Sequence, residues 1–338
     1  MPRRSGTAPT LATVADEAGV SRQTVSNALN SPHLLRPDTL QRVRRAIDTL
    51  GYSPNRAARN LRTRASHLIG LKIEPAAEGA DALMDRFLHS LVGSSESAGY
   101  HVLLFSSDVQ GDPQAGYDAL LRSTAVDAFV ITDTYRGNPQ AGWLDKSGAP
   151  FVAFGRPWNE PAATHPWVDV DGRAGVVLAV DHLVARGHSR IAWVGWAKSF
   201  IGEDRRAGWS EAMRSHGLAT RGLSARGDDT VDFGRAAALA LLESEQPTAI
   251  VCASDIVAMG VLHALFELRL QPGRDIAVVG FDDSIAAQIT PPGLTSVRQP
   301  LEQVAVEIVR LLGKRLSHKP IDEPSCLLAP TLTVRRST

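Results

Sequence analysis

The sequence predicts two kinds of structure in one chain of 338 residues: a small all-α headpiece and a larger α/β region built on parallel sheets. Three short helical patterns, punctuated by glycine or proline, occupy residues 10–52. Beyond residue 66, apolar strand-like runs alternate with helical runs, which is the pattern of parallel sheets with helices on both faces. A chain of this length is too long for one small core, so several domains are expected.

The first two helical patterns predict a helix-turn-helix. Thr10 can cap the first helix, and Gly19 ends it because glycine adopts a positive φ without steric cost. Ser21 then caps a second helix, whose apolar residues share its inner face. The outer face carries side chains that can reach base edges and phosphates in a major groove: Arg22, Gln23, Ser26 and Asn27.

A third helix is predicted to begin at Pro37, because proline is tolerated in a first helical turn, and to end at Gly51. Its apolar stripe consists of Leu40, Val43, Ile47 and Leu50. Three arginines lie between the stripe residues: Arg42, Arg44 and Arg45. The three helices are therefore expected to share one small core.

Charge is divided unequally between the two parts of the chain. Residues 1–66 hold eleven arginines and four acidic residues, a net charge of +7, so the remainder of this formally neutral chain carries −7. A helix-turn-helix pattern by itself more often reflects ordinary helix packing than DNA binding. The basic headpiece favours a phosphate-binding role, which makes double-stranded DNA the predicted partner.

Two motifs of the headpiece resemble the LacI/GalR family of bacterial transcription regulators: Val20-Ser21-x-x-Thr24-Val25-Ser26-x-x-Leu29-Asn30 and Leu50-Gly51-Tyr52-x-Pro54-Asn55-x-x-Ala58-Arg59-x-Leu61. The resemblance implies a sequence-specific regulator, with a repressor as the expected form. It also implies a set of DNA-binding residues: Thr10, Ser21, Arg22, Gln23, Thr24, Ser26, Asn27, Asn30, Tyr52, Asn55, Ala58, Arg59, Leu61 and Arg62. Asn27 stands where the family frequently has arginine, so we expect a different base preference there.

Residues 54–66 connect the headpiece to the rest of the chain. Asn55 is a plausible cap for two helical turns, although a helix this short and rich in arginine is marginal alone, and a solvated linker is the alternative. The family resemblance implies a hinge helix that folds on the operator, pairs with its dimer mate and wedges Leu61 between base pairs. Leu61 is the one large apolar residue of this segment, which supports the wedge.

The large region contains seven predicted strands at 68–73, 101–105, 128–132, 150–154, 190–195, 248–253 and 275–281. Helical patterns at 172–186 and 256–268 lie between some of them. Ligands of such sheets bind beyond the carboxyl ends of the strands. Polar residues gather at those ends: Gly155-Arg156, Ser254-Asp255 and Asp282-Asp283.

Later motifs extend the family resemblance over nearly the whole chain, among them Val279-Gly280-Phe281-Asp282-Asp283 and Thr295-Ser296-Val297-Arg298-Gln299-Pro300. The resemblance implies a periplasmic-binding-protein-like module of two doubly wound parallel-sheet lobes with an effector between them. The expected domains are a headpiece (1–53), a hinge or linker (54–66) and an effector-binding and dimerisation domain (67–338). We expect one lobe at about 67–168 with 293–322, and the other at about 169–292 with 323–338.

The resemblance also implies effector-binding residues: Leu83, Met84, Arg156, Arg205, Ser254, Asp255 and Asp282. Asp282-Asp283 has an alternative role as a solvated turn or helix cap. Several positions depart from the family pattern; for example, glycine at 155 replaces a frequent aspartate, and no aromatic stands near Asp229. A sugar or sugar derivative is the effector class that the family favours. Trp158 could stack on a sugar ring or pack on the surface.

Other features exclude competing classes. No apolar run follows the first residues or is long enough for a membrane span, so we expect no signal peptide, no membrane contact and a cytoplasmic, nucleoid-associated protein. Cys252 and Cys326 lie in strand-like runs and are expected as free core thiols, with no metal site. No cofactor and no catalytic residue is predicted. The chain ends after its last strand pattern, which favours a homodimer.

Two rival classes remain. A secreted solute-binding protein of similar fold would need a signal peptide and would have no use for a basic headpiece. An α/β enzyme such as a dehydrogenase would be expected to carry a Gly-x-Gly-x-x-Gly turn, and the sequence contains neither that turn nor a Gly-x-Ser-x-Gly elbow.

Overall fold

The computed structural model describes residues 9–52, 65–73, 82–106, 112, 114–132, 134, 139–158, 160 and 163–338. The chain divides into two compact units, residues 1–66 and 67–338. The division falls at the end of the predicted linker. Within the described ranges, no helix has both the length and the apolar character that crossing a bilayer requires.

The headpiece is a small helical unit with its own core. Its elements, in chain order, are α1 (Leu11–Ala18), α2 (Arg22–Asn30), the 3-10 turn η1 (Pro32–Leu34) and α3 (Pro37–Leu50). Val14, Val25 and Val43 come from the three α-helices and are fully buried against one another. One side chain from each helix therefore fills the centre of the headpiece, and the three predicted helices are confirmed.

The first lobe of residues 67–338 is a six-stranded sheet in which every neighbouring pair is parallel. Its strands are ordered β11-β5-β4-β3-β1-β2. The elements are β1 (Leu68–Lys72), α5 (Ala82–Ser97), β2 (His101–Phe105), α6 (Ala115–Arg122), β3 (Ala128–Ile131), α7 (Pro139–Ser147), β4 (Phe151–Phe154), β5 (Trp167–Val170), α13 (Leu301–Leu316) and β11 (Ser325–Leu328).

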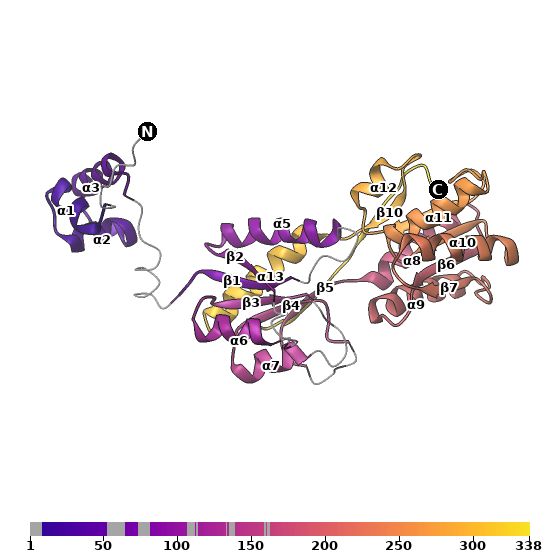
Figure 1. The fold of residues 1–338 in the computed structure, drawn as a ribbon, viewed down its shortest axis with the longest axis horizontal. Coiled ribbons are helices and arrows are strands. Elements are labelled where there is room, and N and C mark those ends of the chain that lie inside the picture. The colour runs from indigo at the N-terminus through magenta and orange to yellow at the C-terminus, as the bar shows by residue number, and fades with distance from the viewer. Residues whose placement is uncertain are drawn as a thin grey trace. The chain divides into compact units, whose positions relative to one another are not determined.

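Helices cover both faces of this first sheet (Figure 1). One face packs a cluster that includes Phe87 of α5 and Ile308 of α13. The other packs a cluster that includes Tyr117 of α6 and Leu144 of α7. Two separate cores on one sheet are the signature of the doubly wound architecture that the alternating pattern predicted.

The second lobe is also a six-stranded sheet, ordered β12-β10-β9-β8-β6-β7. Its edge strand β12 runs antiparallel to β10, whereas the prediction was of parallel strands throughout. The elements are α8 (Gly172–Ala185), β6 (Ile191–Trp196), α9 (Phe200–Ser215), β7 (Ser224–Gly227), α10 (Val231–Ser244), β8 (Ala249–Cys252), α11 (Asp255–Glu267), β9 (Ala277–Phe281), α12 (Ile285–Ile289), β10 (Thr295–Arg298) and β12 (Thr331–Thr333).

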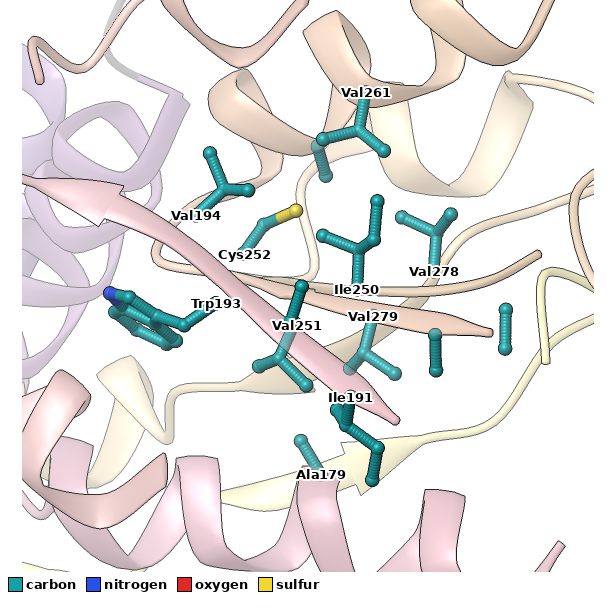
Figure 2. Close-up of a cluster of buried hydrophobic side chains, with 14 of the residues drawn as sticks. Ala179, Ile191, Trp193, Val194, Ile250, Val251, Cys252, Val261, Val278 and Val279 are labelled. Atoms are coloured by element: carbon teal, nitrogen blue, oxygen red, sulfur yellow. The ribbon is translucent and has the colours of Figure 1, made fainter. Parts of the chain in front are cut away.

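The core of the second lobe is formed by its central strands. Figure 2 shows aliphatic side chains of β8 and β9, such as Ile250 and Val279, packed together with Trp193 of β6. Cys252 lies in this core as a free thiol, as predicted. Cys326 is also free, but it is half-buried on the edge strand β11 because no further strand covers that side of the sheet.

The chain crosses between the lobes three times. The first crossing follows β5, close to Asp169 as expected. The other two come later than expected: β10 still pairs with β9 of the second sheet, so the return lies beyond Arg298 and not near residue 293. Likewise β11 pairs with β5 of the first sheet, so the last crossing lies beyond Leu328 and not near residue 323. Strand pairing, which no local pattern reveals, decides these boundaries.

Candidate nucleic-acid interface and interlobe site

Side-chain caps and one glycine build the helix-turn-helix. Thr13 N donates to Thr10 Oγ1 at 3.3 Å, and Thr10 N donates to Thr13 Oγ1 at 2.8 Å, which forms a reciprocal capping box. Gly19 ends α1 at a φ of +62°, a backbone conformation that residues other than glycine rarely adopt. Thr24 N donates to Ser21 Oγ at 3.1 Å and so caps α2. The predicted caps are confirmed, and they set the angle at which α2 leaves the turn.

Polar side chains occupy the outer face of α2. Arg22 and Gln23 are exposed, and Asn27 is half-buried. Gln23 Nε2 donates to Asn27 Oδ1 at 2.9 Å. Asn30 Nδ2 instead donates to the main-chain oxygen of Ser26 at 2.7 Å. The face predicted to meet DNA therefore exists, with some of its groups already hydrogen-bonded within the helix.

The remaining predicted DNA contacts fall into two groups. Tyr52 is 9% exposed and packs in the headpiece core, so its ring supports the fold of the headpiece. Five predicted contacts lie outside the described residues: Asn55, Ala58, Arg59, Leu61 and Arg62. Exposed arginines add positive charge to the described surface: Arg22, Arg36, Arg42, Arg44 and Arg45.

A second candidate site lies where the two lobes of residues 67–338 meet. We name it the interlobe cluster and define it by Arg86, Arg156, Trp158, Trp196, Phe200, Asp204, Arg205 and Asp282. Arg205 of α9 is 5% exposed and donates through Nη1 to the main-chain oxygen of Ala253 at 2.6 Å. Its guanidinium carbon lies 3.6 Å from the ring centroid of Phe281 and 5.0 Å from that of Trp196. Arg205 is thus a buried cation between two aromatic rings.

Asp282 is the partly paired carboxylate of this cluster. Its Oδ1 atom lies 3.9 Å from Arg205 Nη2 and accepts a hydrogen bond from Gln299 Nε2 at 2.7 Å. Burial raises the pKa of Asp282 to about 7, although the charge of Arg205 opposes this rise. Burial likewise lowers the pKa of Arg205. Both groups give up solvation to occupy this site, which is typical of functional positions.

The alternative role of Asp282-Asp283 as a solvated turn is wrong. Asp283 is 2% exposed, and its Oδ1 atom lies 2.6 Å from Arg335 Nη2. Arg86 of α5 donates through Nη1 to the main-chain oxygen of Asp282 at 3.1 Å. The turn is therefore held by side chains of both lobes.

Ser254 and Asp255 lie at the start of α11 and bond to their own lobe. Ser254 Oγ accepts from Val257 N at 3.1 Å, which caps the helix, and it donates to Asp229 Oδ1 at 2.5 Å. Asp255 is 3% exposed and accepts hydrogen bonds from Ser296 Oγ and from the main chain of the β9–α12 turn. Burial raises the pKa of Asp255. The hydrogen bonds of Asp255 therefore hold elements of its own lobe together.

Arg156 lies near the first crossing. Its Nε atom lies 2.6 Å from Asp169 Oδ2, and its Nη2 atom lies 3.7 Å from Asp204 Oδ2 in the second lobe. The Arg156 guanidinium also stacks over Trp158, 4.5 Å from the ring centroid. Trp158 in turn stacks with Phe200 of α9 at 6.2 Å between centroids and 13° between planes. Trp158 therefore packs between the lobes, against Arg156 and Phe200, and its stacking on a sugar ring stays a prediction.

Leu83 and Met84 lie on the first turn of α5 and pack, partly buried, against the core of the first lobe. A separate groove of about 820 Å³ runs along α13 and β11. Its lining, which includes Glu307 and Arg310, shares no residue with the interlobe cluster. Among the described residues, no group of three or more His, Cys, Asp or Glu side chains is arranged to hold a metal ion.

Comparisons with known proteins agree with this geometry. Residues 10–55 match the family described as bacterial regulatory proteins, lacI family, and residues 180–338 match the periplasmic binding protein-like domain. The transcriptional regulator CelR of Thermobifida fusca is 33% identical over 97% of this chain and 98% of its own length. The chain belongs to the LacI family of transcriptional regulators.

Solved structures of LacI-family regulators share the whole fold. The complex of the regulator CelR with cellobiose is 31% identical, with a TM-score of 0.74 over 98% of this chain and 100% of that one. The lac repressor dimer bound to operator and an anti-inducer is 26% identical, with a TM-score of 0.80 over 98% of this chain and 99% of that one. The headpiece and the two-lobed domain are thus the two functional parts of a LacI-family regulator.

Sequence reasoning missed several members of the interlobe cluster in this LacI-family chain. Arg86 lies two residues after Met84, and Asp204 directly precedes Arg205, and both Met84 and Arg205 are predicted effector residues. Helical spacing could have suggested them, but charged side chains on helices are usually solvated. Sequence reasoning also missed the role of Gln299, which lies beside the cluster, follows β10, donates a hydrogen bond to Asp282 and is 3% exposed. Its burial is the signal, and burial is known from the structure alone.

Proposed function

We propose that this chain is a homodimeric transcriptional repressor that binds a pseudo-palindromic operator. Its affinity for the operator would change, in either direction, when a sugar-like effector occupies the interlobe cluster. The observation that carries the proposal is one chain that joins a basic helix-turn-helix to two lobes that meet at buried and partly buried charged groups. Two headpieces would read two half-sites, with arginines on the phosphates. The cell compartment would then be that of the chromosome, the cytoplasm.

A polar ligand between the lobes is supported by unsatisfied donors. Arg205 Nε, Trp158 Nε1 and Trp196 Nε1 are buried and have no acceptor among the described residues. Buried N–H groups normally have an acceptor, and the hydroxyl groups of a sugar would provide it. An aromatic ring suits the apolar face of a sugar. The rings of Trp158 and Phe200 stack on each other, and that of Trp158 on Arg156, so a sugar would have to replace one of these contacts. The cellobiose complex of CelR supports this effector class.

We rank the seven predicted effector-binding residues in two groups. Arg205 and Asp282 rank first, because Arg205 is buried, Asp282 is largely buried, and each is only partly paired. The other five are Leu83, Met84, Arg156, Ser254 and Asp255, which bond or pack within the protein. Their contribution would be to shape the site, and a ligand would have to displace existing contacts to touch them.

The DNA-bound form is proposed to be a dimer, in keeping with the dimeric lac repressor on its operator. The linker of residues 54–66 would form the paired hinge helices, with Leu61 as the wedge in the minor groove. Replacing Leu61 by alanine should weaken operator binding and reduce the bend of the DNA. An unaltered bend angle in that variant would contradict the wedge.

Fluorescence anisotropy of the full chain on DNA from upstream of its own gene tests the proposal. We expect tight, salt-sensitive binding, because phosphate contacts release counterions. When the complex is titrated with each sugar of a panel that includes cellobiose, one of the sugars should dissociate the protein from the DNA. Binding that requires a sugar would make the ligand a corepressor, and a lack of any specific DNA binding would contradict a regulator of this kind.

Two controls separate the two parts. Residues 67–338 alone should lose DNA binding, whereas the Asp282→Ala variant should bind DNA normally and lose the ligand response. A normal response in the Asp282→Ala variant would remove Asp282 from the site. Turnover of any candidate sugar, followed by chromatography, would revive the rival enzyme class.

A further inference from the structure

Two amide side chains on the outer face of α2 are hydrogen-bonded to each other. Gln23 Nε2 donates to Asn27 Oδ1 at 2.9 Å, and their spacing of four residues places both on one face of the helix. Within the described residues, this bond leaves the Gln23 carbonyl oxygen and the Asn27 NH2 group without a partner. If the two amides exchanged roles, the pair would still keep one carbonyl oxygen and one NH2 group.

Most polar side chains near this pair are already hydrogen-bonded within the helix-turn-helix. Ser21 and Thr24 bond to each other at 2.9 Å at the helix start. The Asn30 amide donates to the Ser26 carbonyl oxygen at 2.7 Å. Arg22 is exposed, and its guanidinium offers donors alone. The Gln23–Asn27 pair therefore offers this face both an unpaired donor and an unpaired acceptor.

The major-groove edges of the four bases differ in what they offer this pair. Adenine presents an acceptor, N7, beside a donor, the N6 amino group. Guanine presents two acceptors, cytosine a donor, and thymine an acceptor beside a methyl group. A carbonyl oxygen next to an NH2 group complements the adenine edge and would face an unfavourable second acceptor on guanine.

We propose that Gln23 and Asn27 act as one unit that reads a single adenine in each operator half-site, an inference that rests on the proposed DNA-binding function. The hydrogen bond between the amides holds both side chains in place before binding, which lowers the entropic cost of ordering them. Each residue is therefore a specificity determinant at the same base. Removal of either one frees the other, so their effects are not additive.

Selection of DNA from a random double-stranded library by the full-length protein tests this unit. We expect an adenine at one fixed position of each half-site. Replacing that adenine by guanine, or by 7-deazaadenine, which lacks the N7 acceptor, should weaken binding by about tenfold in anisotropy titrations. Gln23→Ala and Asn27→Ala should each relax the preference at that position, and the double variant should match either single one.

The matched control is Asn30→Ala, because the Asn30 amide is held by Ser26 within the helix. This variant should keep the adenine preference. The inference is overturned if the selected sites lack such an adenine, if the two variants relax different positions, or if Asn30→Ala relaxes the same one. A selection that recovers no DNA sequence at all would instead contradict the DNA-binding function itself, so the two failures are distinguishable.

Discussion

Arg156 Nη2 lies 3.7 Å from Asp204 Oδ2, and this ion pair joins a side chain of the first lobe to α9 of the second. Arg156 is anchored on its own side by Asp169 at the first crossing. The stacked rings of Trp158 and Phe200 bridge the lobes beside it. A movement of one lobe against the other would have to break these contacts, so they stabilise one arrangement of the lobes.

Asp204→Asn should shift that arrangement without changing side-chain size. Ion pairs near the surface contribute about 0.2–1 kcal/mol, so we expect DNA affinity without ligand and affinity for the effector each to change by about 1.4- to fivefold. Both depend on the same equilibrium between lobe arrangements, and the coupling is reciprocal. Anisotropy and calorimetric titration measure the two affinities.

The control for this change is Asp118→Asn, which breaks the exposed pair between Asp118 and Arg122 within α6. It should leave both affinities unaltered. A change in effector affinity alone would show that Asp204 touches the ligand, and unchanged values for both would show that the Arg156–Asp204 pair does not hold the lobes.

Stability should depend on pH through Asp282. Burial raises the pKa of this carboxyl to about 7, whereas an unfolded aspartate has a pKa of about 3.9. The folded state therefore binds the proton more tightly, and the contribution of Asp282 to the free energy of unfolding falls as pH rises from about 4 to about 7. Asp282→Asn, which imitates the neutral acid, should lack this fall.

The difference in unfolding free energy between Asp282→Asn and the natural chain is the quantity to measure, by urea titration at pH 5.5 and pH 8. Relative to the natural chain, the free energy of unfolding of the variant should be about 1–2 kcal/mol higher at pH 8 than at pH 5.5. Burial lowers the pKa of His165, His182 and His188, which acts in the opposite sense, but these groups are common to both proteins. A difference independent of pH would contradict the raised pKa.

Asp283→Ala should destabilise residues 67–338 strongly. The substitution removes the carboxylate 2.6 Å from Arg335 Nη2 and leaves a largely buried guanidinium without a counter-ion, with the main-chain oxygen of Leu294 as its remaining partner. Breaking such a pair costs about 3–5 kcal/mol, and the partial exposure of Arg335 places the expected loss at the lower end. Thermal or urea unfolding would measure it, with Asp118→Ala, at an exposed pair, expected to cost less than about 1 kcal/mol.

Gly19→Ala should destabilise the headpiece without affecting the lobes. A side chain at the left-handed φ of +62° costs about 1–2 kcal/mol. Amide hydrogen exchange of the full chain should therefore speed up in α1 to α3, and DNA affinity should fall, while exchange in the lobes stays the same. Glu17→Ala, an exposed change on the same helix, provides the comparison; equal exchange in the two variants would contradict the strain at Gly19.

Much of this protein could be predicted from sequence because the deciding interactions are local. The caps at Thr10 and Ser21, the glycine at the turn and the helical spacing of Val14 and Val25 all act within a few residues. The same holds for the central strands, whose apolar runs overlap the observed strands. Local hydrogen bonds and periodic burial therefore gave the helix-turn-helix, the α/β class and the polar strand ends at Arg156 and Asp282.

Tertiary structure alone decided which distant groups meet. Asp283 and Arg335 are paired because β12 returns beside β10, and Arg86 reaches Asp282 because α5 begins at the second lobe. The same pairing of strands set the lobe boundaries. The sequence by itself determined the elements and the two parts of the chain; the structure determined the interlobe cluster, because long-range packing removes charged side chains from water and so fixes their partners.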